Sequence, residues 1–441
     1  MTTRNKSGAF ILILLFLLSP LLPLVEYFSG NWYSILHSYS IGMVFGIFAY
    51  GYFLNTLILS TRLPVFDRIF GQDRVMVLHG YLAMLALLFA GIHAAYKISF
   101  HFAITRQTVL GIASLAIFAA VIAVTLTAMV SGRLQRISFM QKFRTWLTAK
   151  TIFDYSKLKL FHNLTSVAAL LAAIHVFMAY STKESQTRMA IMNVWAGLAL
   201  ALYIWHKFIR LILLRRKSWT VAEVNRLSPG IAEISMERNA GNFKGQKAGQ
   251  FAYFRFLSPE CGMEEHPFTI ASRPGSTSLS IIFKELGDYT AKLKNIKPGT
   301  TALVNGPYGL FTPLQKNPLL FIAGGIGITP FRAILQEWNH SGIEAPTVLI
   351  WSCRNADQMI YRAFFEECDK LHENFTFIPV LTGEGGQGRI EQSLLEKHID
   401  KATLDQTEVF VCGPDSLNKA CATMLTSIGI HKKNIRYEKF G

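Results

Sequence analysis

The sequence has 441 residues, 51% of them hydrophobic, and its mean hydropathy is +0.30. The hydrophobic fraction and the hydropathy exclude a purely soluble protein, and the length exceeds that of one ordinary domain. The formal net charge is +16, and residues 1–217 contain 21 Lys and Arg against 5 Asp and Glu, whereas residues 218–441 contain 23 of each. Because the basic excess lies in the apolar half, the charge argues against a nucleic-acid binder and indicates a membrane protein.

Six apolar segments are long enough to cross a bilayer, which requires about 20 residues. They lie near residues 8–25, 38–60, 75–97, 107–131, 159–181 and 188–214. The first could also be a signal peptide, although no A-x-A cleavage site is evident before Asn31. The N-terminal residues and the expected inner connections contain 17 Lys and Arg, against four outside, so we expect the second half to be cytoplasmic.

The third and fifth spans each carry two histidines. His79 and His93 are 14 positions apart in the third span, and His162 and His175 are 13 positions apart in the fifth. Ionisable side chains inside a span are costly and suggest function. Because both spans run in the same direction, we expect His79 to face His162 on the inner side and His93 to face His175 on the outer side. This suits two stacked haems, while hydrogen bonds between helices are the alternative.

The spacing of 13 in the fifth span is a geometric problem. At about 100° per residue, 14 positions return to within about 40° of the same helix face, but 13 positions end about 140° away. The span must therefore bend, unwind locally, or present its histidines at different approach angles. No Gly or Pro lies between the two histidines to explain such a change.

The second half has two different patterns. From Trp219, short strands separated by turns predict a small antiparallel β-barrel over residues 218–313. Strands that alternate with helices predict a doubly wound parallel sheet over residues 314–441. All five cysteines lie in this half without a CxxC pair, which predicts free thiols in a reducing compartment. The membrane domain is then residues 1–217.

The histidine pairs resemble those of the ferric reductase and NADPH oxidase superfamily, which also shows the spacing of 13. The resemblance covers residues 38–441. It implies two b-type haems, one held by His79 and His162 and the other by His93 and His175. It also implies that NADPH reduces FAD in the cytoplasm, and that electrons pass through the inner and then the outer haem to an acceptor outside.

The flavin motifs support the same resemblance. His266-Pro267-Phe268-Thr269 follows the third predicted strand and resembles the flavin-binding motif of ferredoxin–NADP reductase-like domains. The resemblance implies that Thr269 faces the reactive nitrogen of the isoalloxazine ring. Gly287-Asp288-Tyr289-Thr290 opens a short helix whose backbone N–H groups can bind the FAD pyrophosphate. The first motif alone could be an ordinary turn, but Gly306-Pro307-Tyr308-Gly309 at the barrel's end makes the set more specific.

A glycine-rich turn indicates the nucleotide site. Gly324-Gly325-Ile326-Gly327-Ile328-Thr329-Pro330 lies between a buried strand and a helix. Its glycines let the backbone approach a pyrophosphate, Thr329 can cap the helix, and Pro330 fits the first turn. This is not a GxGxxG pattern, but it resembles the family's nicotinamide-nucleotide site. Arg354 is a candidate partner of the NADPH 2′-phosphate; if it is an ordinary surface arginine, NADH is the alternative.

Three more candidates rest on the resemblance. Cys412-Gly413-Pro414 resembles the Cys-Gly pair near the hydride-donating carbon of nicotinamide, although Cys412 could be a small core residue. Phe440 matches a C-terminal aromatic that stacks on the flavin, with a frayed terminus as the alternative. Lys97, one turn beyond His93, could stabilise superoxide or extend to the membrane interface.

We therefore expect a multi-pass enzyme of the bacterial inner membrane. No Cys, His or carboxylate cluster marks a chelate site on the short outer loops, which favours oxygen as acceptor and superoxide as product. A ferric or cupric chelate, a quinone or a partner protein are alternative acceptors, and a transporter with proton-relaying histidines is the non-redox alternative. Without an EF-hand pattern or docking tail, we expect no obligatory regulatory protein.

Overall fold

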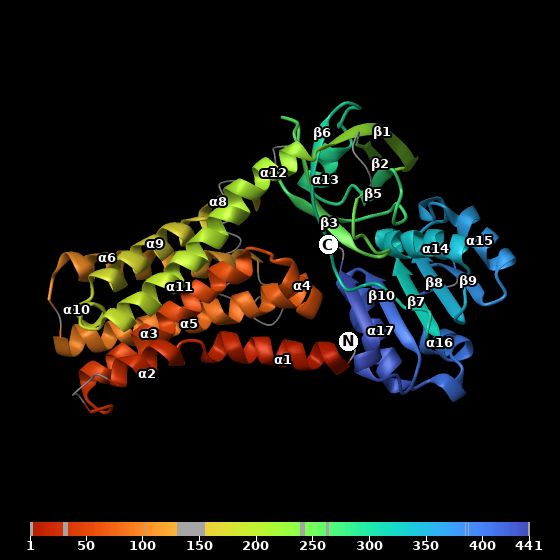
Figure 1. The fold of residues 1–441 in the computed structure, drawn as a ribbon. Coiled ribbons are helices and arrows are strands. Elements are labelled where there is room, and N and C mark those ends of the chain that lie inside the picture. The colour runs from red at the N-terminus through yellow and green to blue at the C-terminus, as the bar shows by residue number, and fades with distance from the viewer. Residues whose placement is uncertain are drawn as a thin grey trace. The chain divides into compact units, whose positions relative to one another are not determined.

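The computed structural model describes residues 3–439 except for 30–33, 102, 130–154, 239–242, 262–263, 384 and 387. The chain divides into two compact units, which meet between Leu211 and Ile212. The first is a bundle of helices and the second is built on two β-sheets (Figure 1). The predicted domain boundaries at residues 217 and 313 stay predictions.

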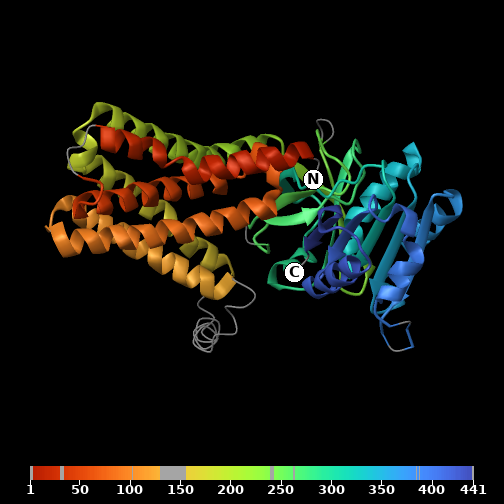
Figure 2. The same ribbon diagram turned by 90° about the horizontal axis from the view of Figure 1, so that it is seen from below.

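Six helical segments in the described part of the chain are long and apolar enough to cross a membrane. They are Ser7–Ser29, Ser38–Ser60, Gln72–Phe100, Arg106–Leu126, Lys157–Met178 and Gln186–Arg216. These segments are close to the six predicted spans, and their helices lie side by side in both views (Figures 1 and 2). Many of their large apolar side chains face outward, and Leu22 and Val194 are 65% and 70% exposed. Such a surface suits lipid, which suggests a membrane protein.

Three of the six segments are interrupted. The first contains α1 (Thr3–Leu18) and α2 (Leu21–Ser29), with Pro20 at the break. The fifth contains α8 (Tyr155–His162) and α9 (Leu164–Met178), and the short α10 (Tyr180–Lys183) follows. The sixth contains α11 (Gln186–Ile204), a π-helical turn (Trp205–Ile209) and α12 (Arg210–Arg216). The remaining helices are α3 (Ser38–Ser60), α4 (Pro64–Phe70), α5 (Gln72–His101) and α6 (Arg106–Met129).

Each histidine-bearing span has a supporting helix. The helix α3 packs along α5, and α6 packs along α9. The Ser114 hydroxyl on α6 donates to the Ala168 carbonyl on α9 at 2.8 Å, and this hydrogen bond joins the two helices. Asn55 on α3 donates to the Phe16 carbonyl at 2.9 Å and so binds the end of α1, where the backbone leaves its helix. Such hydrogen bonds between spans fix their register.

The first sheet of the second unit has six strands in the order β4-β3-β6-β1-β2-β5, and all described pairs are antiparallel. The strands are β1 (Trp219–Ser228), β2 (Ile231–Glu237), β3 (Phe251–Phe256), β4 (His266–Thr269), β5 (Ser278–Lys284) and β6 (Thr301–Tyr308). The motif His266–Thr269, which the sequence places after a strand, is itself the edge strand β4. A single bridge between Ile270 and Ile281 links the two ends of the sheet, without a continuous ladder among the described residues.

The second sheet is parallel, with the order β11-β10-β7-β8-β9. Its strands are β7 (Leu319–Gly324), β8 (Thr347–Cys353), β9 (Phe375–Leu381), β10 (Glu408–Gly413) and β11 (Ile435–Lys439). One face packs on α14 (Thr329–Ser341) and α15 (Arg362–Leu371), and the other on α16 (Gln392–His398) and α17 (Asp415–Ser427). Phe321 faces α14 and the neighbouring Ile322 faces α17, because side chains alternate along a strand. This is the parallel sheet expected from the sequence.

Candidate functional site

The structure brings the four span histidines together in two pairs. The ring centroids of His79 and His162 are 6.3 Å apart, and those of His93 and His175 are also 6.3 Å apart. The ring planes meet at 54° in the first pair and at 83° in the second. Each pair joins α5 to the fifth span, as the parallel direction of these spans predicts.

Backbone carbonyls hold three of the four rings through Nδ1. The distances are 3.0 Å from His79 to Thr56 O, 2.7 Å from His93 to Gly42 O, and 2.8 Å from His175 to Gln107 O. Because a carbonyl oxygen only accepts, Nδ1 must carry the proton, which leaves the lone pair on Nε2. His162 has a weaker partner, the Thr125 hydroxyl at 3.4 Å. A donated Nδ1 hydrogen bond is the usual support of a metal-bound imidazole, so the rings suit axial ligation.

Two glycines make room for the outer pair. A Cβ on Gly46 would lie 2.6 Å from Nδ1 of His93, and a Cβ on Gly111 would lie 2.7 Å from Nδ1 of His175. Gly46 lies four residues after Gly42, whose carbonyl accepts from His93, and Gly111 lies four residues after Gln107 in the same relation to His175. Sequence reasoning missed both glycines, although Gly42 and Gly46 form a small-xxx-small pattern that marks close helix packing.

A cavity of about 360 Å³ lies between the outer histidines. Its walls include small side chains, among them Ala86, Ala90, Ala94 and Ala172, which leave room for a flat group between α5 and α9. The predicted Lys97 also lines this cavity, and its ammonium lies 3.4 Å from the centroid of the Tyr39 ring. Lys97 therefore lies near His93 and His175, held by a cation–π contact, and its role toward the acceptor stays a prediction.

The fifth span is interrupted at Asn163, between its two histidines. One helix ends at His162 and the next begins at Leu164. The hydroxyls of Thr165 and Ser166 donate to the carbonyls of His162 and Asn163 at 2.7 and 2.6 Å, and the Asn163 side chain accepts from Lys207 at 3.0 Å. Side-chain hydroxyls that donate hydrogen bonds to backbone carbonyls can bend a helix without Gly or Pro. An interruption of the helix and different ring angles in the two pairs thus accompany the spacing of 13.

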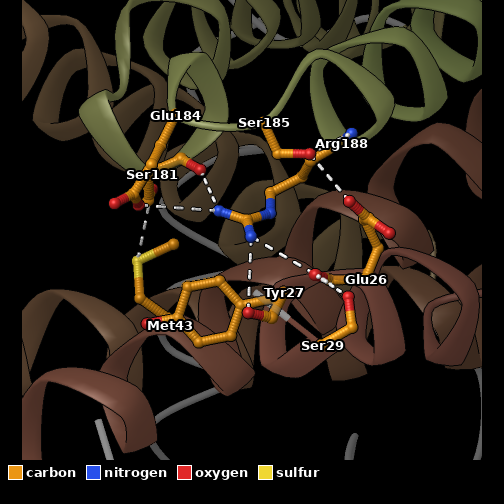
Figure 3. A network of polar contacts seen from close by, with 8 residues as sticks. All are labelled: Glu26, Tyr27, Ser29, Met43, Ser181, Glu184, Ser185 and Arg188. Atoms are coloured by element: carbon orange, nitrogen blue, oxygen red, sulfur yellow. Dashed lines mark hydrogen bonds and ion pairs between the residues drawn. The ribbon is translucent and has the colours of Figure 1, made fainter. Parts of the chain in front are cut away.

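A buried arginine fixes the outer end of the bundle (Figure 3). Arg188 is 4% exposed and donates to the carbonyl of Ser181 and, at 3.3 Å each, to those of Glu26 and Tyr27. The chain between α9 and α10 is extended at Ala179, and this turn lines the outer cavity. Arg188 therefore holds the turn against α2. In the sequence, Arg188 is only one of the four basic residues expected outside.

If His93 and His175 hold the haem that the resemblance implies, substitution of Gly46 by alanine should remove that haem selectively. The added methyl group would meet the His93 ring at 2.6 Å, so the ring must leave the Gly42 carbonyl. We expect occupancy of that haem to fall about 10-fold or more, since changes in the packing and hydrogen bonding of a metal ligand have effects of this size. Haem content per FAD measures it. Gly91→Ala, near His93 but with no atom within 4 Å of the added carbon, is the control. Equal haem contents in the two variants would contradict this account.

The structure places the two flavin motifs side by side. The imidazole of His266 stacks on the ring of Tyr289 with a centroid distance of 3.6 Å, and Phe268 lies 6.3 Å from the same ring. The hydroxyl of Thr269 is buried without a hydrogen-bond partner among the described residues. The hydroxyl of Thr290 accepts from the N–H groups of Leu286 and Gly287 at 3.0 and 3.1 Å, which shapes the start of α13 (Asp288–Leu293). An orphaned buried hydroxyl on β4 fits a bound ring that completes its hydrogen bonding.

The glycine turn forms a 3₁₀ helix (Gly325–Ile328) between β7 and α14. A Cβ on Gly327 would lie 2.1 Å from the Cys412 carbonyl oxygen, so only glycine fits there. The Trp351 indole donates to the Gly325 carbonyl at 2.9 Å and anchors the turn. The expected cap is wrong in detail: Thr329 is already helical, and its hydroxyl donates to the Ile326 carbonyl at 2.8 Å. Pro330 lies in the first turn as predicted.

The remaining candidates lie around this turn. Cys412 is the last residue but one of β10, with its carbonyl against Gly327, and it is fully buried. Burial raises the pKa of its thiol, which therefore stays protonated. Gly413 and Pro414 follow it, at the start of α17. Arg354 is exposed directly after β8. Phe440 lies outside the described residues, so its stacking role stays a prediction.

Comparison with known proteins identifies the second half. A protein-family model described as "FAD-binding domain" matches residues 216–312, and one described as "Oxidoreductase NAD-binding domain" matches residues 321–423. The chain is a flavin-dependent NAD(P)H oxidoreductase. Together with the six apolar helices, the two domains are consistent with the ferric reductase and NADPH oxidase superfamily.

The oxidoreductase is similar to several known proteins. A ferredoxin–NADP reductase B of Sorangium cellulosum is 28% identical over 231 residues, which are 49% of this chain and 94% of that protein. Flavohemoprotein A of Dictyostelium discoideum is 31% identical over 149 residues, 33% of this chain and 37% of that protein. The crystal structure of a ferredoxin NADP+ reductase from Neisseria gonorrhoeae has a TM-score of 0.44 at 22% identity, over 50% of this chain and 97% of that one.

Proposed function

We propose that the oxidoreductase transfers electrons from cytoplasmic NADPH across the bacterial inner membrane to an acceptor on the outer face. The observation that carries this proposal is the two pairs of span histidines, three of which have Nδ1 held by a carbonyl and Nε2 left for a metal. We propose that His79 and His162 hold an inner haem b, and His93 and His175 an outer haem b. The basic inner connections support this orientation.

When bound, FAD supplies hydride chemistry and haem supplies one-electron chemistry. The chain's own residues would orient these groups and exclude water. We propose that Thr269 directs its unpartnered hydroxyl at the flavin ring, and that the antiparallel sheet acts as the barrel beneath that ring. The turn at Gly324–Gly327 would hold the nicotinamide nucleotide, with Arg354 at the 2′-phosphate of NADPH.

We propose oxygen as the acceptor and superoxide as the product. The outer cavity supports this, because the described part of its lining offers one Lys or Arg, Lys97, and no Asp or Glu among its apolar, aromatic, amide, hydroxyl and histidine side chains. A cation near the outer histidines favours an anionic product by electrostatic attraction. Among the described residues, no group of three or more His, Cys, Asp or Glu offers a metal site for a bound chelate.

The test is acceptor-dependent turnover of the purified protein in detergent. NADPH oxidation is measured in air with a superoxide reporter, and then without oxygen in the presence of a ferric chelate. The proposal expects a reporter signal that superoxide dismutase removes and that disappears without oxygen. A dismutase-insensitive rate that persists anaerobically with the chelate would establish a metalloreductase instead. Turnover only after a quinone or a partner protein is added would establish an electron carrier.

A further inference from the structure

A buried ion pair joins the two sheets of the oxidoreductase unit. Glu233 lies in β2 and is 8% exposed, and its Oε1 accepts from Nη1 of Arg332 at 3.2 Å. Arg332 lies in the first turn of α14, directly after the glycine turn. The same Nη1 donates to the Ala271 carbonyl at 3.3 Å, two residues beyond Thr269. One guanidinium therefore contacts the chain next to the flavin motif while it belongs to the helix that follows the nucleotide motif.

Tyr361 completes this contact. Its hydroxyl donates a short hydrogen bond to Oε2 of Glu233, and the guanidinium of Arg332 lies 4.0 Å from the centre of its ring. Its backbone is left-handed, with φ of 60°, directly before α15. A bulky residue keeps this conformation only where its surroundings hold it. Burial and the hydrogen bond to Glu233 raise the pKa of the Tyr361 hydroxyl, so it remains a donor at neutral pH.

We propose that Glu233, Arg332 and Tyr361 form a clamp that sets the position of the nicotinamide relative to the flavin ring. They are positioning residues for hydride transfer and touch neither reactant. The clamp rests on the FAD- and NAD(P)H-dependent activity and on the two predicted binding motifs. Hydride transfer depends steeply on the geometry of the reactants, and a misplacement of about 1 Å can cost about 100-fold in rate.

The clamp orients the two sheets relative to each other more than it stabilises their contact. Apolar contacts already hold the sheets together, because Ile282 and Phe311 from the flavin side share one buried cluster with Phe331 and Ile334 of α14. A buried ion pair contributes little net stability beside such a cluster but has strict geometric demands. A polar cavity of about 460 Å³ borders Glu233 and Arg332, and its walls include Ser272, Ser280 and Arg273. Water from this cavity can solvate the clamp side chains when their contacts are lost. A clamp variant should therefore change the relative position of the two sheets without unfolding.

Single-turnover kinetics tests the clamp. The full-length enzyme in detergent is mixed anaerobically with NADPH, and with NADPH deuterated at the transferred position, while flavin absorbance is followed. Glu233→Gln keeps the shape of the side chain and removes its charge. We expect the limiting rate of flavin reduction to fall about 10-fold, the apparent Kd of NADPH to change less than about threefold, and the isotope effect to rise. Combining it with Arg332→Gln should add little further loss, because the two residues act as one unit.

Arg273→Gln is the matched control, because Arg273 lines the same cavity but is exposed and outside the clamp. Its rate should equal that of the wild type. A Glu233→Gln variant with a lower melting temperature but an unchanged limiting rate and isotope effect overturns the proposal. If that variant does not fold, the same limiting rate and isotope effect are measured in Tyr361→Phe, which removes only one hydroxyl, and unchanged values overturn the proposal. Wild-type enzyme that fails to reduce its flavin with NADPH would contradict the assigned activity itself, independently of the clamp.

Discussion

Replacement of His93 by leucine abolishes electron delivery to the outer acceptor while NADPH still reduces FAD. Leucine has no nitrogen for iron, and the bond from the His93 ring to the Gly42 carbonyl is lost as well. We expect one haem per chain to be missing and acceptor reduction to fall about 100-fold or more, since removal of an axial ligand leaves no second imidazole at that level. Flavin reduction by NADPH should stay within about twofold, because the change does not touch the soluble unit.

The control for this change is His101→Leu, at the end of the same helix α5. It lies outside both histidine pairs and should leave two haems per FAD. The order of transfer would be contradicted if His93→Leu slowed flavin reduction as much as acceptor reduction. Retention of both haems in His93→Leu would contradict the assignment of His93 as a ligand.

We expect replacement of Gly327 by alanine to weaken NADPH binding strongly and to leave the electron path beyond FAD usable. The new methyl carbon would lie 2.1 Å from the Cys412 carbonyl oxygen, which belongs to β10. That strand is paired on both sides, with β7 and β11, so its backbone cannot withdraw without breaking a ladder. The turn must move instead, at a cost of about 1–3 kcal/mol for overpacking. We expect the apparent Kd of NADPH to rise about 10-fold to 100-fold.

Flavin reduction at increasing NADPH concentrations measures this effect. Dithionite should still reduce the variant fully, and FAD content should be unchanged, because the flavin motifs lie in the other sheet. The neighbouring Ile326→Val, a loss of one methylene, is the control and should bind NADPH normally. Normal NADPH affinity in Gly327→Ala would show that the turn does not hold the nucleotide.

The sequence predicts the larger features because each has a strong pattern. The spans follow from long apolar runs, and the pairing of the histidines follows from the direction of two helices. The parallel sheet follows from alternating strands and helices, and its order places the glycine turn after the central strand β7. These predictions need only the period and length of a segment, which single sequences carry well.

The details that complete the sites depend on contacts between distant residues. Nothing near Gly111 in the sequence shows that His175, on another helix, fills the space beside it. The break at Asn163 depends on hydroxyls two and three residues later and on Lys207 from the last span. The Glu233 clamp joins residues about 100 positions apart. Tertiary packing decides each of these, so local patterns could not reveal them.

The most direct test of the account is the haem content and redox response of the purified protein. FAD and haem are quantified in detergent, and NADPH is then added without oxygen while the Soret band and the flavin band are recorded. The account predicts two haem b per FAD, with low-spin spectra and full reduction of both by NADPH. A preparation that contains FAD and oxidises NADPH but shows no Soret band would contradict it.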